Sequence, residues 1–569
     1  MTTRQRLSEL MIRRVFFGAD WLTPVMARAL PGTATVLALS LVAACAGLAA
    51  PMITKAVIDQ GIMGGDMGAL LFWAAVSFAV GLGLVALGIC TSMQHLRASM
   101  RMLGDLRLTI LGCALNRNPA MPDLTVGEVQ TRIDGDTAEI QKFLFDSVLV
   151  AVTALFRLAG GTVLMILLDW RLALLPLLAA PFELWFLSWA RPGTQARAET
   201  VRTERGGLNG QLAETFIQVG GLRALGALNT RADGFETQQG ALFDAQARQK
   251  LWAESVGAVS KLLTAVMRSA VLLVGGWLVI RGDWQIGSLV AFLAYAAMMA
   301  GPLRNLLGLY HAQSRARVAL ARLNEVVRDA ADPEEGAPCP PAFQQLGFIG
   351  ARGQAGAHAP VSVTLKAGSR VLVDGRSGIG KSQLLSAIIG QAPLAEGRIE
   401  LDGADTAGFS MASRRRAVAY LPQRPCLIRG TLRDNLQIGN DNPDDAALWR
   451  VLDMVDLAGW ARGLSGLDTD LHETGANLSG GMRQRITLAR TLLRSSQVFV
   501  FDESFSEIDA ESCARILSAI EAHLADALCI FVAHAGPVRS LDFARIVDLS
   551  VETQGEDMRE PCVRLVGTG

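Results

Sequence analysis

The sequence has few charged residues and no excess of either sign. Only 19% of its 569 residues are charged, and 53 lysines and arginines balance 53 aspartates and glutamates. Proteins that bind nucleic acid usually carry a basic surface, so this balance gives no support for a nucleic-acid partner. Hydrophobic residues make up 51% of the chain and the mean hydropathy is +0.32, which indicates that much of the chain lies in lipid.

Paired cysteines are also missing. The eight cysteines include no C-x-x-C pair, and this spacing favours reduced, individually buried thiols over a disulfide framework or a zinc site. They lie at positions 45, 90, 113, 339, 426, 513, 529 and 562.

The first 32 residues lack the features of a cleaved signal peptide. They contain Arg4, Arg6, Arg13 and Arg14, but no continuous apolar core and no small-residue cleavage site. Such a basic segment suits the cytoplasmic surface of a membrane. An ordinary solvated helix is the alternative.

A chain of 569 residues is too long for a single hydrophobic core, so we expect at least two domains. Six apolar stretches, each long enough to cross a bilayer, occupy residues 33–58, 68–93, 146–168, 171–190, 255–280 and 285–309. The long connections at 94–145 and 191–254 are rich in arginine, which places them and both termini in the cytoplasm. We therefore predict a six-helix, all-α transmembrane domain over residues 33–328 of a multi-pass membrane protein.

The long connections are themselves predicted to be helical. In the second, Leu208, Leu212, Phe216 and Val219 recur at helical spacing before two glycines interrupt the pattern. We interpret this pattern as membrane helices that continue beyond the bilayer and are joined by a short crosswise helix. An ordinary surface hairpin is the alternative.

The composition changes at residues 329–341, where prolines and acidic residues replace the apolar runs. Such a segment cannot pack a core, so we predict a linker. Beyond it, apolar runs such as 369–373 and 498–501 alternate with helical stretches. This alternation predicts an α/β domain with a phosphate-binding loop over residues 342–569.

The phosphate-binding loop follows a short apolar run that is typical of a buried strand. Its sequence fits G-x-x-x-x-G-K-[ST] and comprises Gly375, Arg376, Ser377, Gly378, Ile379, Gly380, Lys381 and Ser382. Glycines let backbone N–H groups converge on phosphate oxygens, the lysine neutralises the phosphates, and the serine ligates Mg²⁺. Because the chain has only six lysines, a chance match is improbable, and we predict that this loop binds a nucleotide.

Two carboxylates, Asp502 and Glu503, follow the apolar run at residues 498–501. In phosphoryl-transfer enzymes, a strand that ends in two acids delivers the first to the Mg²⁺ shell and the second to the attacking water. We predict these roles for Asp502 and Glu503. A core strand that ends in two acids by chance is the alternative.

A third motif, Leu478-Ser479-Gly480-Gly481-Met482-Arg483-Gln484-Arg485, opens a helix upstream of the two acids. Small residues at a helix start expose free backbone N–H groups, which form another anion site. Two phosphate sites with only one lysine loop suggest that the second serves the nucleotide of another subunit. This run resembles the signature sequence of the ATP-binding cassette (ABC) transporter family, and the resemblance covers nearly the whole chain.

The resemblance implies roles for further residues. Gln423, in Tyr420-Leu421-Pro422-Gln423, resembles the Q-loop glutamine, which touches Mg²⁺ and senses the membrane domain. Asp509 ends a run similar to the D-loop, which links the two sites of a dimer, and His534 resembles the switch histidine that holds the γ-phosphate of ATP. The implied catalytic residues are Glu503, His534 and Gln423; the implied cofactor contacts outside the phosphate loop are Ser479, Gly480, Gly481, Gln484 and Asp509; and the implied Mg²⁺ ligands are Ser382, Gln423 and Asp502.

One position departs from the family pattern. Exporters of this family usually carry an aromatic residue two positions beyond the equivalent of Phe348, where it stacks on adenine, but Gly350 stands there. Judged from aromatic pairs, loss of the stack costs about 1 kcal/mol. His358 is the next candidate partner for adenine.

The resemblance implies an ATP-hydrolysing exporter in a bacterial inner membrane, with its nucleotide-binding domain in the cytoplasm. It is expected to act by alternating access as a homodimer, with a heterodimer as the alternative assembly, on a small peptide, a lipid or a lipophilic drug. We expect no amino-terminal peptidase domain before the first span, so the exporter is not expected to cleave a leader itself. An ATP-gated channel or regulatory subunit is the alternative function. The six spans exclude a soluble DNA-repair ATPase, and an importer is disfavoured because importers usually place these domains on separate chains.

Three charged residues, Arg157, Glu183 and Arg268, lie within the predicted spans. At about 1.5 Å per residue, each is roughly 16 to 18 Å from the outer end of its span, near the middle of the bilayer. A charge there is costly and usually faces a cavity or a partner. We predict that Arg157 pairs with Glu183, whereas Arg268 faces the translocation cavity and favours an anionic substrate. A structural network without substrate contact is the alternative.

Overall fold

The computed structural model describes residues 19–121, 124–331, 334–340, 342–354, 356–440, 442–533, 536–549 and 563–565. The chain divides into two compact units. The first comprises Met1–Leu111 and Gly127–Glu325, and the second comprises Gly112–Val126 and Val326–Gly569. Residues 1–18, which carry the predicted basic segment, lie outside the described residues.

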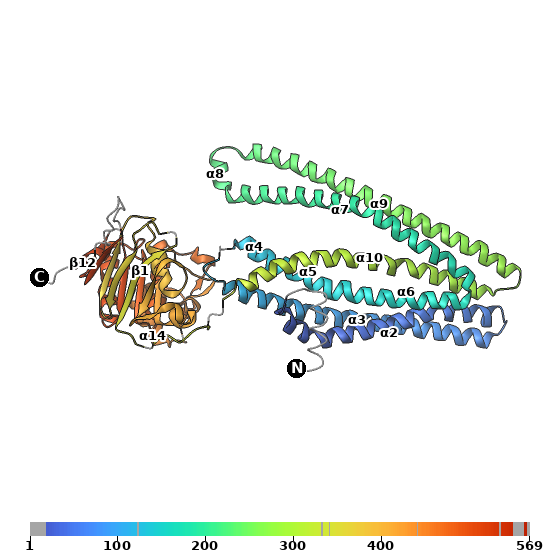
Figure 1. Cartoon of the computed structure of the whole chain (residues 1–569), viewed down its shortest axis with the longest axis horizontal. Coiled ribbons are helices and arrows are strands. Elements are labelled where there is room, and N and C mark those ends of the chain that lie inside the picture. Colours follow the sequence, from blue (N-terminus) through green and yellow to red (C-terminus); the bar gives the residue numbers. More distant parts are fainter. Residues whose placement is uncertain are drawn as a thin grey trace. The chain divides into compact units, whose positions relative to one another are not determined.

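Long helices make up the first unit (Figure 1). A chain segment that crosses lipid must satisfy its backbone hydrogen bonds internally, which the predicted apolar stretches achieve as helices. The long helices are α2 (Leu22–Ala56), α3 (Met67–Leu115), α6 (Leu149–Leu168), α7 (Trp170–Ile217), α9 (Leu228–Ile280) and α10 (Ile286–Arg328). Shorter helical segments connect them: η1 (Val57–Ile62), α4 (Val126–Gln130), η2 (Thr131–Asp136), α5 (Thr137–Lys142), η3 (Phe143–Val148) and α8 (Val219–Ala224).

Within the residues that the structure describes, five helical segments are long and apolar enough to cross a membrane. They are Leu22–Ile62, Met67–Leu115, Gly127–Leu168, Trp170–Ile217 and Leu228–Ile280. The sixth predicted stretch lies on α10, whose described apolar part includes Ile286–Met299. The helical membrane domain is therefore confirmed.

Helices α7 and α9 lie side by side and are joined by α8 (Figure 1). The helical spacing from Leu208 to Val219 falls on the end of α7 and the start of α8. Across the pair, the indole of Trp252 donates a hydrogen bond to Thr194 Oγ1 at 3.0 Å, and the Arg197 guanidinium lies 4.2 Å from the centre of the same ring system. Polar and cation–π contacts thus join these two helices as well as apolar packing.

A buried apolar cluster joins α2, α6, α7, α9 and α10. Tyr295 lies in it and donates a hydrogen bond from its hydroxyl to the backbone carbonyl of Leu48 at 2.6 Å. Large apolar side chains on the outside of the unit, such as Phe78 and Leu167, are 75% exposed. A surface of this kind suits contact with lipid.

The second unit contains two main sheets and the helices that pack on them. The four-stranded sheet has the order β2-β1-β4-β5, and the six-stranded sheet has the order β12-β11-β3-β10-β9-β6. The strands are β1 (Gln345–Gly353), β2 (Val361–Lys366), β3 (Arg370–Asp374), β4 (Leu394–Leu401), β5 (Ala404–Asp405), β6 (Val418–Leu421), β9 (Val498–Asp502), β10 (Leu528–Val532), β11 (Arg545–Asp548) and β12 (Val563–Leu565). A small pair, β7 (Gly430–Thr431) and β8 (Asp470–Leu471), lies apart from them.

The helices of this unit are short, and three of them begin at predicted motifs. They are α11 (Lys381–Ser386), α12 (Met411–Ala417), α13 (Leu432–Gln437), α14 (Asp445–Met454), α15 (Ala458–Arg462), α16 (Gly480–Leu492) and α17 (Ala510–His523). The helix α11 begins in the phosphate loop, α16 in the signature run and α17 just after the D-loop. Together with the sheets they confirm the predicted α/β fold class.

Parallel strands bring the predicted motifs to one edge of the six-stranded sheet. Val532 on β10 pairs with Val373 on β3 and with Asp502 on β9. Leu421 on β6 pairs with Phe501 on β9. Because these four strands are parallel, they end at the same edge, which is where open α/β sheets bind their ligands.

The beginning of the predicted linker is held by hydrogen bonds. The N–H of Asn118 donates to the carbonyl of Asp329 at 2.8 Å, and the N–H of Ala331 donates to the carbonyl of Asn116 at 2.7 Å. An ion pair at 3.1 Å joins Arg117 to Asp329. The segment Gly112–Val126, which the sequence assigned to the membrane domain, therefore belongs with the second unit.

The described cysteines are free thiols, as predicted, but they are not all buried. Cys513 and Cys529 are buried, whereas Cys45, Cys90 and Cys426 are exposed. The expectation of individually buried thiols is wrong for these three. Cys45 and Cys90 lie on α2 and α3, which are apolar enough to face lipid, so these thiols need no protein around them.

Candidate nucleotide site

The phosphate loop runs from the end of β3 to the start of α11. Gly375, Gly378 and Gly380 have φ values of 144°, 80° and 108°, a region that only glycine adopts without strain. The buried ammonium of Lys381 donates to the carbonyls of Gly375 and Arg376 at 2.6 and 3.0 Å. Burial lowers the pKa of Lys381, and nearby carboxylates oppose this shift. The loop thus surrounds a cation that suits phosphate.

Asp502 ends β9 and is 1% exposed. Tyr420 donates a hydrogen bond to Asp502 Oδ2 at 2.8 Å, whereas the buried Oδ1 has no hydrogen-bond partner among the described residues. Burial raises the pKa of Asp502, and the hydroxyls of Ser382 and Tyr420 act in the opposite direction. A carboxylate oxygen left without a donor beside a serine hydroxyl fits Mg²⁺, which prefers oxygen ligands.

The hydrogen bond from Tyr420 to Asp502 was not predicted. The sequence places Tyr420 only within the Q-loop run, and tyrosine is rare, with three in the chain. The contact arises because β6 and β9 are neighbours in the sheet, with Tyr420 opposite Val500. The sequence pattern did not give the order of the strands in the sheet, and this order brings Tyr420 beside Asp502.

Glu503 follows Asp502 with a φ of 48°. This left-handed conformation costs a non-glycine residue about 1 to 2 kcal/mol, and such strain is concentrated at functional sites. The Gln423 side chain donates from Nε2 to Glu503 Oε2 at 2.7 Å. The structure therefore brings together the predicted catalytic carboxylate and the Q-loop glutamine, whereas His534 lies outside the described residues.

The signature run begins α16. Ser479 caps this helix by accepting a hydrogen bond from the N–H of Met482 at 3.3 Å. A side chain at Gly480 or Gly481 would collide with Glu507 of the D-loop run. The two glycines are thus required because the D-loop packs directly on the start of this helix.

Gln484, which was predicted to contact the cofactor, is buried beneath the D-loop. Its Nε2 donates to Ser506 Oγ at 3.1 Å, and its Oε1 accepts from the N–H of Glu507 at 2.9 Å. Both polar ends of Gln484 therefore hold the D-loop. The predicted contact of Gln484 with the cofactor stays a prediction, since the amide keeps one N–H donor and one acceptor lone pair beyond these two bonds.

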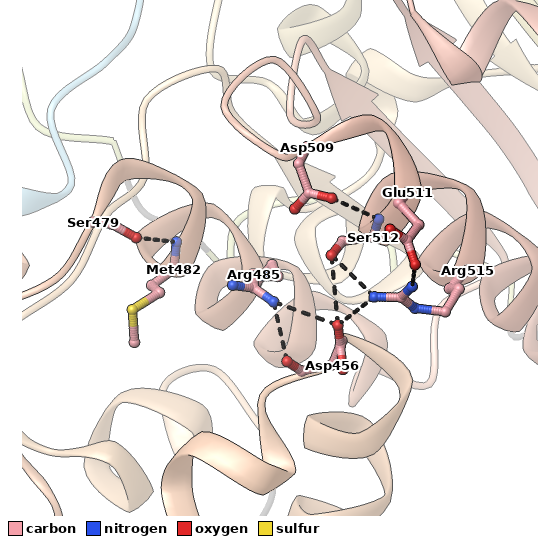
Figure 2. A network of polar contacts seen from close by, with 8 residues as sticks. All are labelled: Asp456, Ser479, Met482, Arg485, Asp509, Glu511, Ser512 and Arg515. Carbon is pink, nitrogen blue, oxygen red and sulfur yellow. Dashed lines mark hydrogen bonds and ion pairs between the residues drawn. The ribbon is translucent and has the colours of Figure 1, made fainter.

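Asp509 begins α17 by accepting a hydrogen bond from the N–H of Ser512 at 2.9 Å (Figure 2). This bond lowers the pKa of Asp509. Beside it, Asp456 pairs with Arg515 at 2.9 Å and with Arg485 of the signature helix at 3.9 Å (Figure 2). Figure 2 therefore shows Arg485 of α16 and the start of α17 within one polar network.

Neither Gly350 nor His358, the two positions considered from the sequence, offers a ring that can stack on adenine. Gly350 has a φ of 58° and lies in an irregular part of β1. His358 is 2% exposed, and a Cβ at Gly380 would lie 3.3 Å from its Cδ2. The His358 ring therefore packs under the phosphate loop and has no exposed face, so it is not available to stack on adenine.

In the first unit, two of the three membrane charges lie on one cavity. Glu183 on α7 and Arg268 on α9 line a cavity of about 470 Å³ that α10 completes, but Arg157 does not line it. The predicted pair of Arg157 with Glu183 is not formed, because neither side chain has an ion-pair partner within 4.0 Å among the described residues. Arg157 is exposed on α6, whereas Glu183 is turned toward α9 and α10.

Comparisons with known proteins agree with this architecture. Residues 33–303 match the model of the ABC transporter transmembrane region, and residues 359–506 match the ABC transporter model. The chain belongs to the ABC transporter family, and its ATPase domain hydrolyses ATP to drive transport.

The names of two relatives give opposite directions of transport, efflux for one and import for the other. The multidrug efflux ATP-binding/permease protein Rv0194 of Mycobacterium tuberculosis is 26% identical over 90% of this chain and 44% of its own length. The mycobactin import ATP-binding/permease protein IrtB of Mycolicibacterium smegmatis is 33% identical over 50% of this chain and 53% of its own. The structure of a bacterial Atm1-family ABC exporter with ATP bound is 21% identical, with a TM-score of 0.78, over 93% of this chain and 94% of that chain. This last likeness establishes an exporter-type fold.

Proposed function

We propose that this protein exports a small peptide, a lipid or a lipophilic drug from the cytoplasm of a bacterial cell, as a homodimer. The observation that carries this proposal is the division of the phosphate sites. Lys381, Asp502 and Glu503 meet at one sheet edge, whereas Ser479 begins a separate helix without a lysine loop. Two copies would each lend the signature run to the nucleotide of the other.

The residues at the sheet edge divide the work of hydrolysis. Lys381 would neutralise the phosphates, and Ser382, Asp502 and Gln423 would hold Mg²⁺, which supplies positive charge to the phosphoryl oxygens when bound. Glu503 would orient the attacking water and accept its proton. The hydrogen bond from Gln423 to Glu503 would keep that carboxylate turned toward the reacting phosphate.

The membrane unit would convert dimer closure into transport. Closure of two nucleotide-binding domains around ATP would draw the long helices together and open the cavity outward, and hydrolysis would reset it. The close pairing of α7 and α9 supports this proposal, because helices held together along their length move as a rigid lever.

The test uses the purified chain alone in lipid vesicles. We expect one of the three substrate classes to stimulate its ATPase and to accumulate against a gradient in vesicles whose nucleotide-binding domains face outward. Flux only down a gradient would favour a channel, and movement in the opposite direction would favour an importer. Absence of ATPase in the single chain, with activity restored by a partner chain, would favour a heterodimer.

A further inference from the structure

The cavity between α7, α9 and α10 combines apolar walls with two opposite charges. Most of its wall comes from side chains such as Met267, Val271 and Leu293, whereas Glu183 and Arg268 are its two charged members. Its volume of about 470 Å³ falls within the range of sites for small organic ligands. A cavity of this kind suits a ligand that is partly apolar and partly charged.

Both charges lie deep in the membrane unit. Arg268 is about 12 residues before the end of α9 at Ile280, and Glu183 is about 13 residues after the start of α7 at Trp170. At about 1.5 Å per residue, each lies roughly 18 to 20 Å from the end of its helix. In a hydrocarbon core about 30 Å thick, this depth is near the middle, where an ionised side chain is costly unless something pairs with it.

The protein does not provide that pairing within its described residues. Neither Glu183 nor Arg268 has an ion-pair partner within 4.0 Å among them. The two side chains share one cavity wall and remain separate. A ligand with one charge would satisfy one side chain and leave the other unpaired. A ligand with both charges would satisfy both.

We propose that this cavity binds a small amphiphile that carries both an amino group and an acidic group. The Glu183 carboxylate accepts hydrogen bonds from the ammonium, and the Arg268 guanidinium donates a pair of hydrogen bonds to the acid. The apolar walls receive the hydrocarbon part of the ligand. This inference rests on the proposed export function and narrows its substrate class.

The experiment measures equilibrium binding to the full chain in lipid nanodiscs without nucleotide. Four probes differ only in charge: the dipeptide leucyl-phenylalanine with free ends, its N-acetyl form, its C-terminal amide, and the form with both caps. Because each cap leaves one charged side chain of the cavity unpaired, we expect each to weaken binding about tenfold.

Two variants assign each charge to its partner. Arg268→Gln should remove the penalty of amidation and keep that of acetylation, and Glu183→Gln should do the reverse. The matched control is Arg157→Gln, which removes an arginine of similar depth that does not line the cavity and should leave both penalties unchanged. Binding of ATP by each variant verifies that it is folded.

Several outcomes would overturn the proposal. Binding of the four probes within twofold of one another, no binding of any probe at millimolar concentration, or unchanged discrimination in both variants would each do so. Transport is measured separately with the free dipeptide in vesicles. Charge discrimination without ATP-driven transport would leave the binding site standing and reject the export function, whereas transport without discrimination would reject only the site.

Discussion

The nucleotide site and the membrane cavity differ in how their polar groups are paired. At the nucleotide site, Lys381, Gln423 and Asp502 each have a defined hydrogen-bond partner within the protein. In the cavity, Glu183 and Arg268 have no ion-pair partner among the described residues. A site that performs the same reaction on the same nucleotide benefits from fixed geometry. A site that must release its ligand benefits from charged side chains that are paired only while the ligand is bound.

The largest expected effect concerns the fixed geometry of the nucleotide site. In Glu503→Gln, the hydrogen bond from Gln423 has lost its charged acceptor and the attacking water has lost its base, whereas Lys381 and Asp502 are unchanged. Steady-state ATPase should fall by about 10² or more, with ATP and a closed dimer trapped. The control is nucleotide binding, which should persist. Turnover within threefold of the wild type would show that Glu503 is not the catalytic carboxylate.

A smaller effect is expected from the hydroxyl that holds Asp502. Tyr420→Phe removes a donor to a buried carboxylate, and loss of such a bond should raise the Mg²⁺ concentration for half-maximal ATPase about tenfold, with the maximal rate retained. Burial already raises the pKa of Asp502 and the hydroxyl opposes this rise. Its loss therefore raises the pKa further, so the activity should decline at a higher pH as the solution is acidified.

A matched control for that variant exists in the other unit. Tyr295→Phe also removes a tyrosine hydroxyl with a hydrogen bond, but its acceptor is the backbone carbonyl of Leu48 in the membrane unit. It should leave the Mg²⁺ and pH dependence of the ATPase unchanged. The same shift in both variants would mean that Tyr420 acts through general stability and does not position Asp502.

The sequence predicted the nucleotide site more completely than the cavity for a physical reason. Lys381, Ser382 and Glu503 lie in motifs whose spacing is short along the chain, so local pattern identifies them. Two contacts depend on neighbours far apart in the sequence, namely Tyr420 with Asp502 and Gln484 with the D-loop. Periodicity predicts each element, but only packing decides which neighbours meet.

The cavity shows the same limit more strongly. Depth along each helix was readable from the sequence, and it placed Arg157, Glu183 and Arg268 at one level. The sequence did not show which side of each helix faces its neighbours. Near Glu183, α7 is apolar around most of its circumference and therefore has no polar stripe that would indicate its orientation. In the structure, Glu183 lines the same cavity as Arg268, and Arg157 does not line it.

The adenine position offers a smaller test on the nucleotide side. Gly350→Tyr supplies the missing aromatic, and a stack worth about 1 kcal/mol should lower the KM for ATP about fivefold without raising the maximal rate. The φ of 58° at Gly350 imposes a loss of folding stability of about 1 kcal/mol on a tyrosine there. Gly350→Asn is the control, because asparagine tolerates this conformation but has no ring. An unchanged KM in the tyrosine variant would mean that adenine is held elsewhere.

The smallest expected effect tests whether the membrane charges are independent. Since Arg157 and Glu183 form no ion pair in the structure, the stability changes of Arg157→Ala and Glu183→Ala should add in the double variant to within about 0.5 kcal/mol. Thermal unfolding in the same lipid measures all three. A real buried pair would behave differently, because loss of either partner leaves the other uncompensated and the second substitution then costs little. A coupling energy of more than about 1 kcal/mol would therefore show that Arg157 and Glu183 form an ion pair. It would also contradict the position of Glu183 in the cavity, which our substrate proposal requires.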